Sequence, residues 1–211
     1  MKDKILIYGA GGHAKVVIDA IEKEQKYKIM AIVDDNSKLH GKNYCGYPVI
    51  GGLSKLVEGK FSDFKIIIAI TDGKVSSKLY RQIKSLGYKL GIVIHPSAVV
   101  ARDVLIGPGT MVMANAVINS NAKIGTNVVI NTGAIVEHDC EIGDFVHIAP
   151  GAHLAGAVKI GEASMVGLGA TVIESRQIGE NSIIGAGTVV INDIPNNVSA
   201  VGVPARIMKR S

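Results

Sequence analysis

The sequence has no tryptophan, only six tyrosines and three phenylalanines, and just two cysteines in 211 residues. Cys45 and Cys140 lie in different predicted units and have neither a metal-binding nor a redox spacing, which favours buried or free thiols in a reducing cytosol. The longest aliphatic runs, such as Ile66–Ile70, are far too short to span a membrane. The first apolar run, Ile5–Tyr8, has the length of a strand and is followed by glycines, unlike a signal peptide. We therefore expect a cytoplasmic protein.

Long runs of one charge are also missing. The net charge is +5 and the isoelectric point is about 9.1, values that suit an anionic partner. However, basic residues do not cluster in the sequence and do not alternate with aromatic ones, which argues against nucleic acid. Anionic small molecules such as nucleotides fit this composition better.

The sequence does contain an aliphatic residue at every sixth position from Ile94 to Val190. There are seventeen such positions, and all except Leu154 are β-branched. Every eighteen residues the aliphatic residue is followed by glycine, at Ile106, Ile124, Ile142, Ile160 and Ile178. This double period predicts a parallel β-helix with three sides per coil, in which β-branched side chains stack inward. We expect each of these glycines to let the backbone turn a corner.

Before this repeat, strand-like and helix-like patterns alternate. Strands are expected at Lys4–Tyr8, Lys28–Val33, Phe64–Ile70 and Lys89–Val93, and Val49–Gly52 is expected to be a strand end or a turn. Helices are expected at Ala14–Glu24, with Val16, Val17, Ala20 and Ile21 on its apolar face, and at Val75–Leu86, with Gly87 as its C-cap. The pattern predicts a small Rossmann-like α/β domain over residues 1–93, followed by a β-helix domain over residues 94–211.

A glycine loop, Gly9–Ala14, joins the first expected strand to the first expected helix. Such a loop lets backbone amides approach a diphosphate at a helix N-terminus. Asp34 follows about twenty residues later, where an acidic residue can bind a ribose hydroxyl. Taken alone, the loop fits an NAD-dependent oxidoreductase, or a tight turn without a ligand. Because the unit is short and carries His13 beside the loop, we expect a single nucleotide diphosphate there.

Three of the six histidines lie within the repeat, namely His138, His147 and His153. His138 comes two positions after the inward Val136 and should point outward. A solvated surface histidine is the simple alternative, but acidic residues flank this one on both sides, and a carboxylate can orient an imidazole and stabilise its cation. One coil further on is Gly156, which we expect to leave room for a ligand.

A metal site is a separate possibility for these histidines. A zinc site like that of the γ-class carbonic anhydrases needs three converging imidazoles. His138, His147 and His153 are nine and six residues apart, so no two of them occupy the same point on successive coils. His147 and His153 fall on adjacent sides of one coil, where one of them can be purely structural. We expect no metal within one chain, and a site between subunits stays open.

Several motifs together resemble one family: Gly-x-Gly-Gly-His near the start, Asp34-Asp35, the hexapeptide repeat, Glu137-His138-Asp139-Cys140, and Gly-Val-Pro-Ala-Arg near the end. They are similar to the NeuD-like, sialic-acid O-acetyltransferase family, which includes bacterial nucleotide-sugar N-acetyltransferases of the bacillosamine and perosamine pathways. The resemblance spans nearly the whole chain. It implies a left-handed β-helix and a homotrimer with active sites between subunits. It also implies transfer of an acetyl group from acetyl-CoA to the amine of a UDP- or GDP-linked 4-amino sugar.

The resemblance also assigns roles to residues. His138 would be the general base, supported by Asp139 where relatives often carry glutamate. The residues that would bind the nucleotide sugar are Gly11, Gly12, His13, Asp34, Asp35 and Asn131. The residues that would contact acetyl-CoA are His147, Gly156, Leu168, Ala186, Pro204 and Arg206. The loop Thr71–Gly73 departs from the Gly-Asp/Asn-Asn that relatives often have there.

Other functions remain open on the sequence alone. The same β-helix would suit an O-acetyltransferase acting on sialic acid or another small hydroxyl substrate. An NAD-dependent oxidoreductase would explain the glycine loop but not the repeat. A non-catalytic scaffold, in which the β-helix serves only for trimerisation, would explain the repeat but not the loop.

Overall fold

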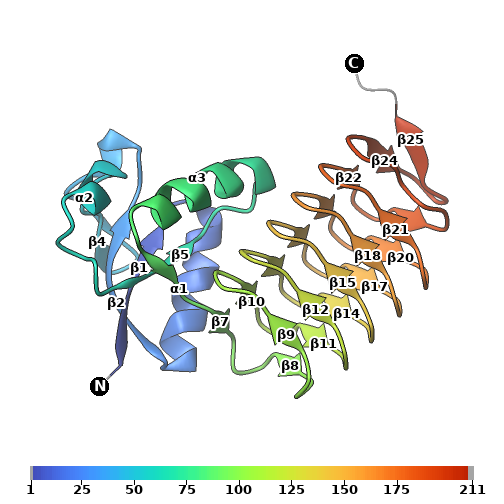
Figure 1. Cartoon of the computed structure of the whole chain (residues 1–211), viewed down its shortest axis with the longest axis horizontal. Helices are drawn as coiled ribbons and strands as arrows, with labels where there is room; N and C mark the ends of the chain where they lie inside the picture. The colour runs from blue at the N-terminus through green and yellow to red at the C-terminus, as the bar shows by residue number, and fades with distance from the viewer. Residues whose placement is uncertain (1, 209–211) are drawn as a thin grey trace.

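The computed structural model of the chain describes residues 2–208, so Met1 and the last three residues of the expected C-terminal tail lie outside it. Figure 1 shows an α/β unit at the N-terminal end and a long stack of short strands that continues to the C-terminal end. This architecture confirms the expected fold class, an α/β unit followed by a parallel β-helix.

The N-terminal unit is built on a four-stranded parallel sheet in the order β2-β1-β5-β6. Its strands are β1 (Asp3–Tyr8), β2 (Tyr27–Val33), β5 (Lys65–Ile68) and β6 (Lys89–Leu90). The other elements are α1 (Gly12–Glu24), η1 (Ser37–Leu39), β3 (Asn43–Tyr44), β4 (Tyr47–Pro48), α2 (Ser54–Val57) and α3 (Gly73–Ser85). Both faces of the central strand β1 are covered, which explains its continuous aliphatic sequence.

Local contacts explain where the expected elements differ from the observed ones. Helix α3 begins earlier than expected because Asp72 caps it, accepting a hydrogen bond from the Val75 amide at 2.9 Å. Val16 was expected on the buried face of α1, but 38% of it is exposed and Ile18 is buried in its place. The fourth strand ends at Leu90, since Val93 already pairs with the β-helix.

The β-helix has three faces. The first face contains β7 (Val93–Ile94), β10 (Met111–Val112), β13 (Val129–Ile130), β16 (His147–Ile148), β19 (Met165–Val166), β22 (Ile183–Ile184), β24 (Ser199–Val201) and the antiparallel β25 (Arg206–Met208). The second contains β8 (Val99–Val100), β11 (Val117–Ile118), β14 (Ile135–Val136), β17 (His153–Leu154), β20 (Thr171–Val172) and β23 (Val189–Val190). The third contains β9 (Leu105–Ile106), β12 (Lys123–Ile124), β15 (Glu141–Ile142), β18 (Lys159–Ile160) and β21 (Gln177–Ile178).

The inward residue of each strand is the one that the six-residue period predicts, and from Val112 to Val190 all are buried. The expected reason for the glycines was wrong. Positive φ angles occur two residues after the glycines, for example at Phe145 and Ala163. The glycines are needed because the coils stack closely: a Cβ on Gly161 would lie 2.5 Å from the Glu180 amide nitrogen of the next coil.

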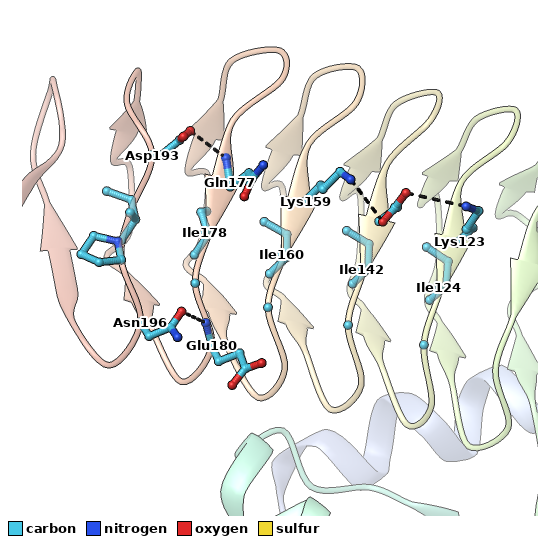
Figure 2. Close-up of a pocket in the computed structure, with 17 residues that line it drawn as sticks. Lys123, Ile124, Ile142, Lys159, Ile160, Gln177, Ile178, Glu180, Asp193 and Asn196 are labelled. Atoms are coloured by element: carbon cyan, nitrogen blue, oxygen red, sulfur yellow. Dashed lines mark hydrogen bonds and ion pairs between the residues drawn. The ribbon is translucent and has the colours of Figure 1, made fainter.

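The outward residues differ from face to face. The third face is charged, and Glu141 pairs with Lys123 at 3.6 Å and with Lys159 at 3.5 Å (Figure 2). The start of the first face is covered, since Val93, Met111 and Val129 share a hydrophobic core with α1 and β1. The second face is mainly aliphatic and partly exposed in a single chain, with Val99, Val117, Ile135, His153, Thr171 and Val189 pointing outward. No helix among residues 2–208 is long and apolar enough to cross a membrane.

Candidate active site

A cavity of about 380 Å³ lies at the carboxyl ends of β1, β2 and β5. It is lined by Gly9, Ala10, Gly11, Gly12, His13, Asp34, Ala69, Ile70, Thr71 and Asp72. Gly9 has a φ of +108°, which favours glycine, whereas Gly11 and Gly12 have open space where a side chain would begin. The loop therefore leaves its backbone accessible at the N-terminus of α1, as an anionic ligand requires.

The two predicted acidic residues have different surroundings. Asp34 lines the cavity, and its carboxylate accepts hydrogen bonds from the amides of Ala10 at 2.7 Å and Asn36 at 2.8 Å. Asp35 is not part of the cavity lining. Its carboxylate accepts from the Tyr8 hydroxyl at 2.7 Å and the Leu53 amide at 2.9 Å. Asp34 thus holds the loop beside the cavity, and Asp35 holds the strand behind it.

His13, Asn131 and His147 form a cluster where the α/β unit meets the first face. The Asn131 amide nitrogen lies 3.1 Å from Nε2 of His147. Burial lowers the pKa of His13 to about 4, and burial together with the nearby His13 lowers the pKa of His147 to about 4. The family resemblance assigned His13 and Asn131 to the nucleotide sugar and His147 to acetyl-CoA. In the structure these three residues lie together.

The hydrogen bonds around Asn131 define the tautomer of His147. The side-chain oxygen of Asn131 accepts from the Thr132 amide at 2.8 Å, so its NH₂ group donates to Nε2 of His147. The neutral imidazole must then carry its proton on Nδ1. That Nδ1 is buried and has no partner within residues 2–208, and neither has Nε2 of His13. Buried ring nitrogens without partners are expected where a ligand completes a site.

The free energy of unfolding is expected to decrease as the pH is lowered, because of these two histidines. Their folded pKa values lie below the value of about 6.5 for an unfolded histidine, so the unfolded chain binds protons first as the pH drops. Between pH 7 and pH 5, urea unfolding at fixed protein concentration should show a loss of about 2 kcal/mol per histidine. The double variant His13→Gln/His147→Gln should lose less over this range. Equal losses in the wild type and the double variant would contradict the prediction.

His138 lies at the corner between the second and third faces, between β14 and β15. It is exposed, and its Nδ1 lies 2.8 Å from a carboxylate oxygen of Asp139. Hydrogen bonds from His138 and Asn121 lower the pKa of Asp139, so this carboxylate is ionised at neutral pH. With Nδ1–H donated to Asp139, a neutral His138 carries its free lone pair on Nε2. This is the geometry of a general base with an orienting acid.

The prediction for Gly156 was half right. Gly156 does lie one coil beyond His138, but the space above it is not open to a ligand. A Cβ there would lie 2.6 Å from Cε1 of His138, so the imidazole itself occupies this space. The absence of a side chain at Gly156 makes room for the His138 ring beside the next coil. On the other flank, Glu137 accepts a hydrogen bond from the His138 amide at 3.3 Å.

The remaining residues predicted to contact acetyl-CoA lie elsewhere on the β-helix. Leu168 and Ala186 are exposed at the corner between the first and second faces on successive coils, and the Gly187 amide donates to the Leu168 carbonyl at 2.8 Å. In the tail, Pro204 is half-buried, the Ala205 amide donates to the Val189 carbonyl at 2.8 Å, and Arg206 is exposed in β25. Within one chain, these residues and His147 are therefore separated from Gly156 and His138.

A groove of about 810 Å³ lies along the third face (Figure 2). It runs beside the column of Lys123, Glu141 and Lys159, and none of the predicted site residues lines it. The volume of this groove therefore does not locate the active site. Converging polar groups are found instead at the smaller glycine-loop cavity and around His138.

Sequence reasoning missed Tyr44, which supports the glycine loop. Its hydroxyl donates to the Gly11 carbonyl at 2.8 Å from the β3–β4 hairpin. No short-range pattern could reveal this contact, because the two residues are 33 positions apart. In residues 2–208 no group of three or more His, Cys, Asp or Glu side chains is arranged to hold a metal ion.

Comparison with known proteins identifies the class of protein. Residues 4–83 match the PglD N-terminal domain family, and residues 121–156 match the bacterial transferase hexapeptide family. A curated relative, UDP-N-acetylbacillosamine N-acetyltransferase of Bacillus subtilis (strain 168), is 40% identical over 114 residues, which are 52% of this chain and 51% of the relative. The match thus spans about half the length of that relative.

Solved structures match over the full length. A variant of perosamine N-acetyltransferase from Caulobacter crescentus, with one histidine replaced by asparagine and with CoA and GDP-perosamine bound, is 40% identical with a TM-score of 0.93. The match covers 98% of this chain and 97% of that one. The acetyltransferase domain of PglB from Neisseria gonorrhoeae FA1090, with acetyl coenzyme A bound, is 36% identical with a TM-score of 0.91, covering 99% and 100% of the chains.

The fold and these matches define a hexapeptide-repeat acyltransferase with a left-handed β-helix and a PglD-type N-terminal domain. The chain belongs to the NeuD-like family that contains the bacterial nucleotide-sugar N-acetyltransferases of the bacillosamine and perosamine type.

Proposed function

We propose that this protein transfers the acetyl group of acetyl-CoA to the amine of a UDP- or GDP-linked 4-amino sugar. The observation that carries the proposal is the pairing of two features in one chain. These are the glycine-loop cavity at the carboxyl edge of a parallel sheet and a carboxylate-oriented histidine on a hexapeptide β-helix. The two units have different roles: residues 1–93 bind the nucleotide, and residues 94–211 carry the general base.

In the proposed reaction the sugar amine attacks the thioester carbonyl while Nε2 of His138 takes a proton from the amine nitrogen. The C–S bond then breaks and CoA leaves as the thiol or thiolate. Asp139 keeps the imidazole oriented and stabilises its cation. Gly11, Gly12, His13 and Asp34 line the nucleotide site, Asp35 supports it from behind, and Asn131 lies near the sugar. Because a thioester is already activated, alignment of the two substrates supplies much of the acceleration.

The acetyl-CoA site would lie along the corner between the first and second faces. His147 offers its Nδ1–H donor at the acetyl end. Leu168 is 57% exposed, which gives an apolar surface for the pantetheine. Ala186, Pro204 and Arg206 continue this surface toward the tail, while the Gly156 backbone would reach the site only from a second copy, beside that copy's His138.

One chain does not bring these parts together. The α/β unit and His147 are on the first face, whereas His138 is at the corner between the second and third faces. In a three-sided prism this is the corner that the first face does not touch. The active site is therefore completed by His138 from a second copy.

The second face is where copies would meet. It is not covered by the α/β unit, and unlike the third face its outward column is mainly aliphatic, including Val117 and Ile135. Burying such a face is favourable. When second faces surround a three-fold axis, the His138 corner of one copy meets the edge of the first face of the next. Three copies arranged in this way form a closed homotrimer.

A thiol-release assay with acetyl-CoA tests the activity. The panel contains UDP- and GDP-linked 4-amino sugars, sialic acid, and the matched nucleotide sugar with a 4-hydroxyl group in place of the amine. We expect rapid CoA release with one amino sugar and none with its hydroxyl counterpart. Release with sialic acid alone would instead indicate an O-acetyltransferase. Failure to bind acetyl-CoA in calorimetry would contradict the acetyltransferase proposal altogether.

A further inference from the structure

A second groove, of about 470 Å³, lies between α3 and the β-helix. Its walls are formed by Lys74, Ser77, Lys78, Arg81 and Gln82 of α3 and by Glu162, Ala163 and Asn181 at the corner between the third and first faces. The start of α3 contacts this corner directly, since a Cβ on Gly73 would lie 2.8 Å from the Phe145 carbonyl oxygen. In Figure 1 this end of α3 is the one nearest the β-helix loops. Both walls of the groove thus belong to elements that pack against each other, helix α3 and the β-helix.

The groove concentrates positive charge. Lys74, Lys78 and Arg81 have the spacing of residues on one helix face, where like charges repel one another. No ion pair joins any of the three to a carboxylate within residues 2–208, whereas Lys23 and Lys65 have carboxylate partners. Among the described residues that line the groove, Glu162 is the one acidic residue. Three cations thus face one anion.

The lining also indicates the chemistry of a ligand. A guanidinium forms two parallel hydrogen bonds with a phosphate, and lysines add point charges. The volume is within the range of small-molecule sites. No aromatic side chain is among the described lining residues, so a nucleobase would have no stacking partner.

From these observations we propose that the groove is an anion site for a small polyphosphate, recognised through its phosphates. It shares no lining residue with the nucleotide cavity, whose lining includes the glycine loop and Asp72. Inorganic pyrophosphate is the simplest probe of this chemistry. The proposal concerns binding and does not depend on the acetyl-transfer reaction.

Calorimetric titration of the full chain with pyrophosphate at 0.15 M salt tests the proposal. Apart from any binding in the nucleotide cavity, we expect one site per chain, with a Kd that rises at least about tenfold in Lys78→Gln/Arg81→Gln, because charge-assisted phosphate contacts are lost. Lys84→Gln is the matched control, since Lys84 is on the same helix but lies over the Tyr80 ring outside the groove. Its affinity should match the wild type, as should that of Gly11→Leu, which fills the nucleotide cavity.

Three results would overturn the proposal. Unchanged pyrophosphate binding in the Lys78/Arg81 variant would show that the groove is not the site. Loss of binding in Gly11→Leu alone would place the anion in the nucleotide cavity. Equal affinity for sulfate and pyrophosphate at the same ionic strength would indicate non-specific ion binding.

Discussion

Replacement of His138 by alanine is expected to lower kcat by at least about a hundredfold, the usual contribution of a positioned general base. Acetyl-CoA binding should stay close to normal, because in the proposed reaction the side chain acts on the amine and not on the cofactor. The measurement is steady-state CoA release, combined with calorimetric titration of acetyl-CoA. A variant with near-normal turnover would remove His138 from the mechanism.

Two further variants separate the roles at this corner. Asp139→Asn removes the charge that holds His138 at 2.8 Å and should lower kcat less than removal of the imidazole. Lys159→Ala removes an exposed side chain from the third face, away from the proposed interface, and should leave kcat unchanged. A large loss in Lys159→Ala would indicate that substitutions of outward residues perturb the β-helix generally, and the result for His138 would lose its meaning.

Mixing two inactive variants is expected to restore activity. His138→Ala lacks the base, and Gly11→Leu places a side chain in the open space of the nucleotide cavity. If each site takes its base from one copy and its nucleotide loop from the next, every mixed trimer contains one intact site of its three. Co-expression of the two differently tagged chains, followed by double-affinity purification and the CoA-release assay, measures this recovery.

The control chain carries both substitutions, and mixing it with either single variant must restore nothing. Adding Ile135→Lys to both members of the active pair should abolish the recovery, since a buried charge on the second face prevents assembly. If the original pair yields no activity although mixed assemblies form, the site lies within one chain and the proposed arrangement is wrong.

The β-helix could be predicted almost residue by residue because its rule is local. Every sixth side chain faces inward, so the inward column from Ile94 to Val190 was readable without knowledge of any distant contact. The glycine loop was equally readable, because its strand and helix neighbours are adjacent in sequence. Family resemblance supplied the role of His138, whose outward direction followed from its distance to Val136.

Other features depend on residues that are distant in sequence. The reason for the glycines after the isoleucines emerged only from stacking against the next coil, eighteen residues on. The exposed Val16 and the early end of the fourth strand depend on how α1 and β7 share the boundary between the two units. The contact between Tyr44 and Gly11 has no sequence signature.

The sequence by itself determined the repeat, the strand positions, the nucleotide-type loop and the candidate base, since each is encoded by spacing or by neighbouring residues. Only the tertiary structure decided that His13 and His147 lie together and that His138 lies opposite them. The physical reason is geometric. Which residues share a face depends on the three-sided winding of the coils and on where the α/β unit packs against them. These contacts join residues more than a hundred positions apart, such as His13 and His147.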